Sequence, residues 1–156
     1  EAVVFKFSNA ICESYNQSWV VIHTCRINAI SRNKNAFNFN ATVLYPCNHI
    51  FIDVQLFKKA NGYKPWLYKI TIDACRFVKK TYNPIAILIY KLFKDYSNIN
   101  HTCPYVGPQI LKGFHLQPDK LGLTLPSGDY LLGLTWFFNR RKTVTTNVYF
   151  IFTEDL

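Results

Sequence analysis

Alternation of apolar and polar residues runs through most of the chain and predicts β-strands. In residues 36–45, AFNFNATVLY, apolar side chains recur at every second position from Phe37 to Val43, with asparagine or threonine between them. A period of two places successive side chains on opposite faces of a strand. The same alternation predicts further strands at residues 2–8, 18–30, 129–138 and 143–152.

Residues 49–75, HIFIDVQLFKKANGYKPWLYKITIDAC, have the pattern of a β-hairpin. Between its two alternating runs lies Asn61-Gly62, a pair that tolerates positive φ and marks a two-residue turn. The apolar face of each strand is then given by its even-numbered positions, Ile50, Ile52, Val54 and Leu56 before the turn and Trp66, Tyr68, Ile70 and Ile72 after it.

The period changes in residues 83–97, NPIAILIYKLFKDYS. Apolar residues fall at i, i+4, i+7, i+8 and i+11 from Ile85, and Pro84 suits the first turn of a helix. We expect one α-helix near 84–96. The Pro- and Gly-rich stretch 101–128 is expected to form loops with one short strand. Seven or eight strands with one inserted helix predict a mainly β fold, an antiparallel β-sandwich, with residues 1–156 as a single domain.

Three observations predict a secreted protein. Sequons for N-linked sugar begin at Asn16, Asn40 and Asn100. The five cysteines are widely spaced and form no C-x-x-C, so disulfides explain them better than a redox motif or a zinc knuckle. The chain opens with EAVVF, which we interpret as the N-terminus of a processed, extracellular protein.

The cysteines allow fifteen schemes with two bridges, and their spacing alone does not select one. We favour Cys12–Cys25, which would tie neighbouring N-terminal strands, and Cys75–Cys103, which would close the helix-bearing segment back onto its strand. Cys47 is left over. It would be free and buried, or it would bridge to a second chain.

The net charge of +9 is compatible with solubility alone or with an anionic partner. No nucleic-acid-binding motif is present, so we expect no nucleic acid partner. Anionic lipid head groups or acidic glycans fit a secreted chain better. A basic rim for an acidic head group or a membrane surface would come from two hairpin tips, with Lys58, Lys59 and Lys64 on one and Arg140 and Arg141 on the other.

Catalytic patterns are weak. The chain has no G-x-S-x-G, and His101 beside Cys103 would need a free thiolate to act as a base–nucleophile pair. A metal site from His101, Cys103 and His115 would lack the usual ligand spacing. Asp53 and Asp73 across the hairpin are better explained as surface or ion-paired groups. We expect a protein that is not an enzyme and has no metal or cofactor.

Three stretches together resemble a known family: LFKKANGYKPWLYKITIDACRFV (56–78), NPIAILIYKLFKDYSNINHTCPY (83–105) and LPSGDYLLGLTWFF (125–138). They are similar to an insect family of small secreted proteins of unknown function that includes the CheB chemosensory proteins. That family is in turn similar to the lipid-recognition superfamily of the ganglioside activator protein. The resemblance implies an immunoglobulin-like two-sheet β-cup with an apolar cavity, four structural cysteines (Cys12, Cys25, Cys75, Cys103) and no catalytic residue.

If the sandwich opens into such a cup, its inner faces would bind a lipid or small hydrophobic ligand, in a chemosensory or reproductive role. The candidate cavity residues are Phe39, Val54, Leu56, Trp66, Tyr68, Leu134, Trp136, Val148 and Phe150. The competing interpretation is a secreted interaction module with a filled core that binds a cell-surface receptor. A cavity above about 300 Å³ would favour the carrier.

Overall fold

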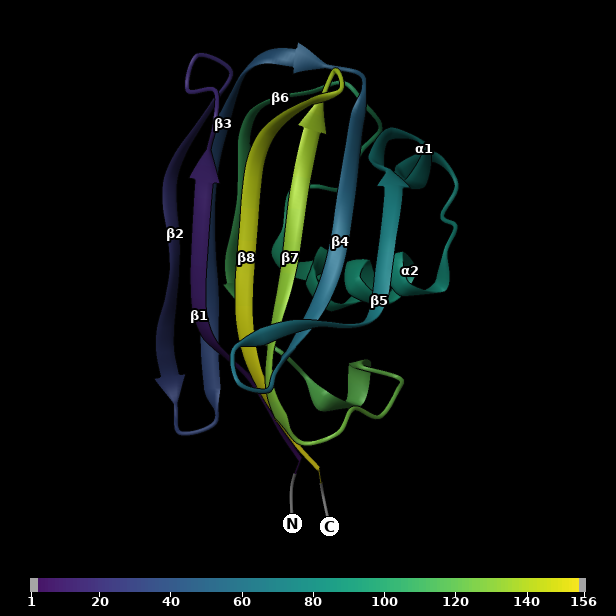
Figure 1. Ribbon diagram of the computed structural model, residues 1–156. Coiled ribbons are helices and arrows are strands. Elements are labelled where there is room, and N and C mark those ends of the chain that lie inside the picture. The colour runs from purple at the N-terminus through teal and green to yellow at the C-terminus, as the bar shows by residue number, and fades with distance from the viewer. Residues whose placement is uncertain (1–2, 155–156) are drawn as a thin grey trace.

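The computed structural model describes residues 3–154, which form two antiparallel sheets packed face to face (Figure 1). The five-stranded sheet has the order β1-β8-β7-β4-β5, and the three-stranded sheet has the order β2-β3-β6. The strands are β1 (Val4–Ser14), β2 (Val20–Ser31), β3 (Lys34–Cys47), β4 (Ile50–Lys59), β5 (Tyr63–Asp73), β6 (Tyr105–Phe114), β7 (Gly128–Phe138) and β8 (Arg141–Thr153). The predicted mainly β sandwich is confirmed at this level.

The two long C-terminal strands pack as their alternation predicts. Leu132 pairs with Val148 and Trp136 with Val144 across the β7–β8 ladder, so the even-numbered apolar residues of both strands share one face. That face points toward the three-stranded sheet. On the same face the indole Nε1 of Trp136 donates a hydrogen bond to Thr146 Oγ1 (3.0 Å), which satisfies the polar atom of a half-buried side chain.

A β-bulge shifts the alternation within β1. The register with β8 changes between Phe7 and Asn9, so the residues that face the interior are odd-numbered before the bulge and even-numbered after it. Phe5 and Phe7 are buried on one side of the bulge, and Cys12 packs on the core from the other. Cys12 then reaches Cys25 of β2, and this disulfide joins one sheet to the other.

The β4–β5 hairpin turns at the predicted place, but its loop comprises three residues, 60–62, instead of two, because Lys59 pairs with Tyr63. Asn61 (φ 62°) and Gly62 (φ 94°) both adopt left-handed backbone, and β4 ends two residues earlier, at Lys59. The strands lose register between Gln55 and Phe57, where β5 has two extra residues. Gln55 Nε2 fills this irregularity by donating to the carbonyls of Leu56 (3.0 Å) and Tyr68 (3.2 Å).

Two α-helices lie between β5 and β6, and only one of them was expected. The predicted helix is α2 (Pro84–Phe93), extended by a 3₁₀ turn over Lys94–Tyr96 and capped by Asn83 Oδ1, which accepts from Ile85 N and Ala86 N. The unexpected helix is α1 (Ala74–Lys79), capped by Asp73, whose Oδ1 accepts from Arg76 N (3.1 Å). Alternation up to Ile72 hid this start, because a strand and a six-residue helix can follow each other without a break.

β6 is longer than the short strand expected within residues 101–128. Gly107, Pro108 and Gly113 interrupt its sequence, but β6 is an edge strand, where such residues are tolerated. It pairs with β3 on one side, and an isolated bridge joins Leu111 to Ser97 on the other. The segment 74–104 therefore leads from the edge of the five-stranded sheet at β5 to the edge of the three-stranded sheet at β6. Figure 1 shows α2 crossing behind β5 and β4, on the inner side of the five-stranded sheet.

Tyr130 is the most deeply buried large residue and should make stability sensitive to alkali. Its hydroxyl donates to the carbonyl of Pro126 (2.6 Å), and its ring stacks on Phe150 at 5.2 Å. Burial, followed by the charge of Glu154, raises the pKa of Tyr130 to about 12. Because the folded state holds this proton more tightly than the unfolded state, the stabilisation is complete below about pH 10 and is lost as the pH rises toward about 12.

The advantage of the wild type over Tyr130→Phe should therefore shrink by roughly 2–3 kcal/mol across that interval. Urea unfolding of both proteins at several alkaline pH values measures it. The other tyrosines titrate in both proteins and cancel in the comparison. A stability difference that does not change with pH would contradict the assignment.

Candidate functional site

An apolar cavity lies between the five-stranded sheet and α2. Its volume is about 120 Å³, and strands β1, β4, β5, β6, β7 and β8 all contribute to its walls. Together with α2 and the segment between β6 and β7, they place eighteen residues around it: Phe5, Phe7, Val54, Leu56, Tyr68, Ile85, Leu88, Ile89, Leu92, Phe93, Phe114, Leu116, Leu121, Leu123, Leu125, Leu132, Val148 and Phe150.

The wall made by α2 is a single helical stripe. Ile85, Leu88, Ile89, Leu92 and Phe93 follow the spacing i, i+3, i+4, i+7 and i+8, which aligns them on one face. None of the helix residues is fully buried, although nearly all of them are apolar. An apolar helix normally loses more of its surface when it packs on a filled core. The incomplete burial of α2 is thus consistent with the space beneath it.

Five of the nine predicted cavity residues line this space, namely Val54, Leu56, Tyr68, Val148 and Phe150. The other four lie elsewhere. Trp66 packs against the ring of Tyr130 at 5.7 Å, and Phe39 packs against Phe37 at 6.2 Å. Leu134 and Trp136 lie farther along β7, toward Phe138. The periodicity gave the correct face for these residues, but it could not say which part of that face the opposite sheet covers.

Several cavity residues were not predicted. Phe5 and Phe7 of β1 are buried in its wall, and Leu116, Leu121, Leu123 and Leu125 come from the segment that was expected to be loop. Between β6 and β7 this segment contains only a 3₁₀ turn, Pro118–Lys120. The recurrence of leucine at every second position from 121 to 125 was an available signal of a buried face. Because these leucines stand among Pro and Gly residues typical of loops, their alternation was not interpreted as a buried face.

The five residues of the predicted basic rim do not form one rim. Lys58 pairs with Tyr130 on β7, whereas Arg140 and Arg141 lie at and beyond the other end of that strand, past Phe138. Tyr130 and Phe138 are eight residues apart along β7, which corresponds to about 27 Å at 3.4 Å per residue. Figure 1 shows the β4–β5 and β7–β8 hairpins at opposite ends of the sandwich. Antiparallel topology places alternate hairpins at opposite ends, so the two tips cannot share one ligand.

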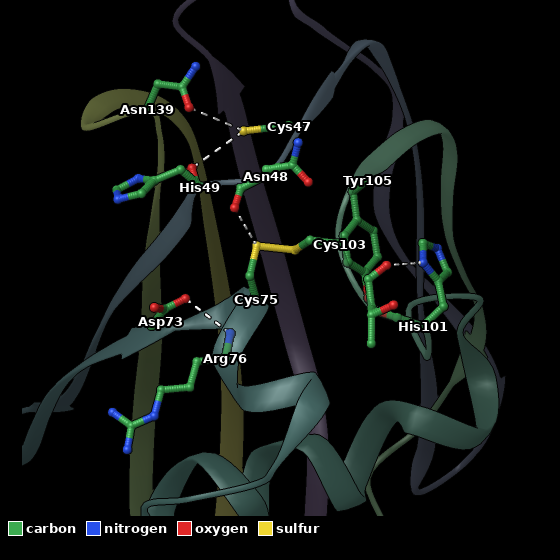
Figure 2. Close-up of a disulfide and its surroundings, with 11 residues drawn as sticks. Cys47, Asn48, His49, Asp73, Cys75, Arg76, His101, Cys103, Tyr105 and Asn139 are labelled. Atoms are coloured by element: carbon green, nitrogen blue, oxygen red, sulfur yellow. Dashed lines mark hydrogen bonds between the residues drawn. A yellow bond between two sulfur atoms is a disulfide. The ribbon is translucent and has the colours of Figure 1, made fainter.

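Two disulfides are present, with the pairing that we favoured. Cys12–Cys25 and Cys75–Cys103 have S–S distances of 2.04 and 2.05 Å. The second bond connects the first turn of α1 to the segment before β6 and so anchors both ends of the helical excursion (Figure 2). Both bonds are within the chain.

Cys47 is free and buried at the end of β3. Its Sγ donates to the carbonyl of His49 at 3.4 Å, and Asn139 Oδ1 lies 4.0 Å away (Figure 2). Burial raises the pKa of this thiol, although the two acceptors lower it in part. With 1% of its surface exposed, Cys47 cannot form the bridge to a second chain considered above without local opening.

His101 and Cys103 do not form a base–nucleophile pair. Cys103 is bonded to Cys75, and the His101 ring stacks on Tyr105 at 4.2 Å, with Nδ1 2.8 Å from the carbonyl of Thr102 (Figure 2). Burial raises the pKa of Tyr105, whose hydroxyl donates to the carbonyl of His101. His101 is exposed and belongs to the turn before β6. Residues 3–154 contain no cluster of three or more His, Cys, Asp or Glu side chains suited to a metal ion.

The three sequon asparagines are accessible to different degrees. Asn16 and Asn100 are exposed in loops, and Asn40 is half-buried on β3. At the first sequon, Ser18 Oγ donates to Asn16 Oδ1 at 2.7 Å.

The two carboxylates of the β4–β5 hairpin have structural partners. Asp53 accepts a hydrogen bond from Thr71 Oγ1 (2.8 Å), and Asp73 caps α1.

No helix within residues 3–154 is long and apolar enough to cross a membrane. No curated protein matches the chain. A protein-family model does match it, over residues 52–132, and its description is "protein of unknown function (DUF1091)". The match includes the β4–β5 hairpin, both helices, β6 and the start of β7, which supply most of the cavity walls. Because it covers just over half of the sequence, the chain belongs to the DUF1091 family of proteins of unknown function.

Proposed function

We propose that this chain is a secreted, non-enzymatic protein that binds a lipid or another small hydrophobic ligand in the cavity beneath α2. The composition of the cavity walls carries the proposal. Among the eighteen lining residues, Tyr68 alone has a polar atom in its side chain. A cavity of this kind offers dispersion contacts and the hydrophobic effect but almost no hydrogen bonds, so it selects hydrocarbon.

The size of the cavity limits what it holds without rearrangement. Engineered cavities of about 150 Å³ with Leu, Ile and Phe walls stay dry and accept benzene. The cavity of about 120 Å³ beneath α2 is of similar size and chemistry, so it fits a ring or a short alkyl segment. A longer acyl chain requires α2 to move outward. The half-buried side chains of that helix make this movement less costly than the displacement of a fully packed one.

Finer assignments belong to the same proposal. We infer an immunoglobulin-like β-cup of the lipid-recognition type, related to the insect CheB chemosensory proteins, with a chemosensory or reproductive role. The two-sheet topology, the two disulfides and the accessible sequons support it. Disulfides and N-linked sugar both belong to the secretory compartment.

The volume of the cavity favours a second candidate, a secreted module that binds a receptor through its surface. Ligand pockets usually exceed about 300 Å³, and this one is smaller. Leu44, Tyr45 and Val106 are 46%, 56% and 49% exposed near the start of β6, where β3 loses register. Exposed apolar patches of this kind are typical of protein interfaces.

Filling the cavity distinguishes the two candidates. Leu88→Trp should occupy the space under α2 and abolish binding of the single-ring probe benzene, measured as the rise in melting temperature that the ligand produces. Ile30→Trp, at a position that is 54% exposed on β2, is the matched control and should bind the probe like the wild type. Mass spectrometry of organic extracts from natively purified protein should in parallel identify a co-purified lipid. A protein that contains no lipid and binds no probe would favour the receptor-binding module.

A further inference from the structure

The β4–β5 hairpin carries a concentration of positive charge. Four lysines and no other charged residue lie between Asp53 and Asp73, namely Lys58, Lys59, Lys64 and Lys69. Lys58 and Lys64 are direct partners across the antiparallel ladder, an arrangement in which like charges repel. Within residues 3–154 no ion pair joins any of the four to a carboxylate. Lys58 turns its Nζ toward the Ser127 carbonyl (3.5 Å) and the Tyr130 ring (5.6 Å). The exposed lysines that an external anion would contact are therefore Lys59, Lys64 and Lys69.

Leu67 adds an apolar anchor to the same hairpin. It is 68% exposed, and its backbone is left-handed (φ 53°), a conformation that is unfavourable for a residue with a Cβ atom. The residues on either side, Trp66 and Tyr68, are partly buried and pack against the core. Gln55 donates a hydrogen bond to the Tyr68 carbonyl within the widened ladder. The bulge therefore holds a large apolar side chain in water and prevents it from turning inward.

We propose that the β4–β5 hairpin docks on an anionic phospholipid bilayer. The lysines would contact the head groups while Leu67 enters the acyl boundary, a division of roles typical of interfacial proteins. Docking on a bilayer requires positive charge and an exposed apolar anchor, and the hairpin has both. It does not require a surface of complementary shape, which a narrow hairpin cannot offer. The hairpin contains no sequon, whereas Asn16 lies beside the opposite end, where Tyr15 contacts Lys142 at 4.5 Å. A glycan there would keep the β7–β8 hairpin away from a membrane.

This inference goes beyond ligand binding and does not require an occupied cavity. It does connect with the proposed function at one point, since Tyr68, next to Leu67, lines the cavity. Docking by this hairpin would therefore place the wall of the cavity near the membrane surface.

Vesicle co-sedimentation tests the charge. The wild type should bind phosphatidylcholine vesicles containing about one-quarter phosphatidylserine, and binding should weaken as salt is added. Each lysine near such a surface contributes about five-fold in affinity, so Lys59→Ala with Lys64→Ala should bind about thirty-fold more weakly. Arg140→Ala with Arg141→Ala removes the same charge at the opposite end and should change binding by no more than about two- to three-fold.

Leu67→Asn tests the anchor. Asparagine tolerates left-handed backbone, so the variant should unfold at the same or a higher temperature than the wild type. It should nevertheless bind the vesicles about ten-fold more weakly, because the apolar contact is lost. Binding of benzene in the cavity should be unchanged, which separates a failure of docking from a failure of the cavity.

Three results would overturn the proposal. The first is equal binding to vesicles of pure phosphatidylcholine. The second is a loss in the Arg140/Arg141 variant as large as that in the Lys59/Lys64 variant, because it would show that net charge alone acts. The third is retention on heparin without any binding to anionic vesicles, which would assign the hairpin to sulfated glycans.

Discussion

Replacing Cys75 and Cys103 together by alanine should lower the free energy of unfolding by about 3–4 kcal/mol. The two residues are 28 positions apart, and in the chain-entropy model a loop of this length restricts the unfolded state strongly. The bond also fixes the start of α1 and the approach to β6, so its loss should free the segment that carries α2. We therefore expect weaker probe binding as well as lower stability.

Urea unfolding measures the first effect, and hydrogen exchange over residues 74–104 measures the second. Replacing Cys12 and Cys25 is the matched control. Its separation of 13 predicts a smaller loss of about 3 kcal/mol, and that bond lies between β1 and β2, away from α2. Every variant also carries Cys47→Ala, so that the free thiol cannot take part in disulfide exchange. Equal exchange of the helical segment in both disulfide variants would contradict the anchoring role of Cys75–Cys103.

Phe150→Ala should destabilise the protein by about 3–5 kcal/mol, the usual cost of removing a buried phenylalanine. The Phe150 ring contacts Phe5 at 5.6 Å and stacks on Tyr130 at 5.2 Å, so its removal deprives two aromatic neighbours of a partner. The side chain is 8% exposed on the sheet side of the cavity. The lost contacts would enlarge the cavity in a part of the core that cannot collapse.

Leu88→Ala is the informative comparison, because Leu88 lines the same cavity from α2 and is only half-buried. Its replacement should cost no more than about 1.5 kcal/mol, below the range for fully buried leucines. Denaturant midpoints of the two variants provide the test. A similar loss of stability in both variants would mean that α2 packs as tightly as the sheet. The incomplete burial of α2 could then not be explained by the cavity.

Local sequence signals predicted the elements well where a single rule applied. The alternation in β7 and β8 gave the buried face correctly, since a period of two leaves no other arrangement once the ladder forms. Asn61-Gly62 gave the hairpin turn, and Pro84 with the helical spacing gave α2. The short helix α1 was missed because its cap, Asp73, directly follows alternating strand residues.

The candidate site was predicted only in part. The inward face of β4, β7 and β8 was available from the pattern, and five of the nine chosen residues line the cavity. One part of that face is covered by α2 and another part by the three-stranded sheet. The path of residues 74–104 decides which strand residues lie under α2. Leu121 and Leu125 are buried in the core without regular secondary structure, so no periodicity identified them as part of the wall.

By itself, the sequence determined the class of fold, the faces of the long strands and the position of α2, because each depends on neighbours along the chain. The tertiary structure decided which residues share a site. Antiparallel pairing placed Lys58 and Arg140 at opposite ends, and sheet-to-sheet packing put Phe5 and Leu125 around one cavity. These relations join residues that are far apart along the chain, and only the packing of complete elements can fix them.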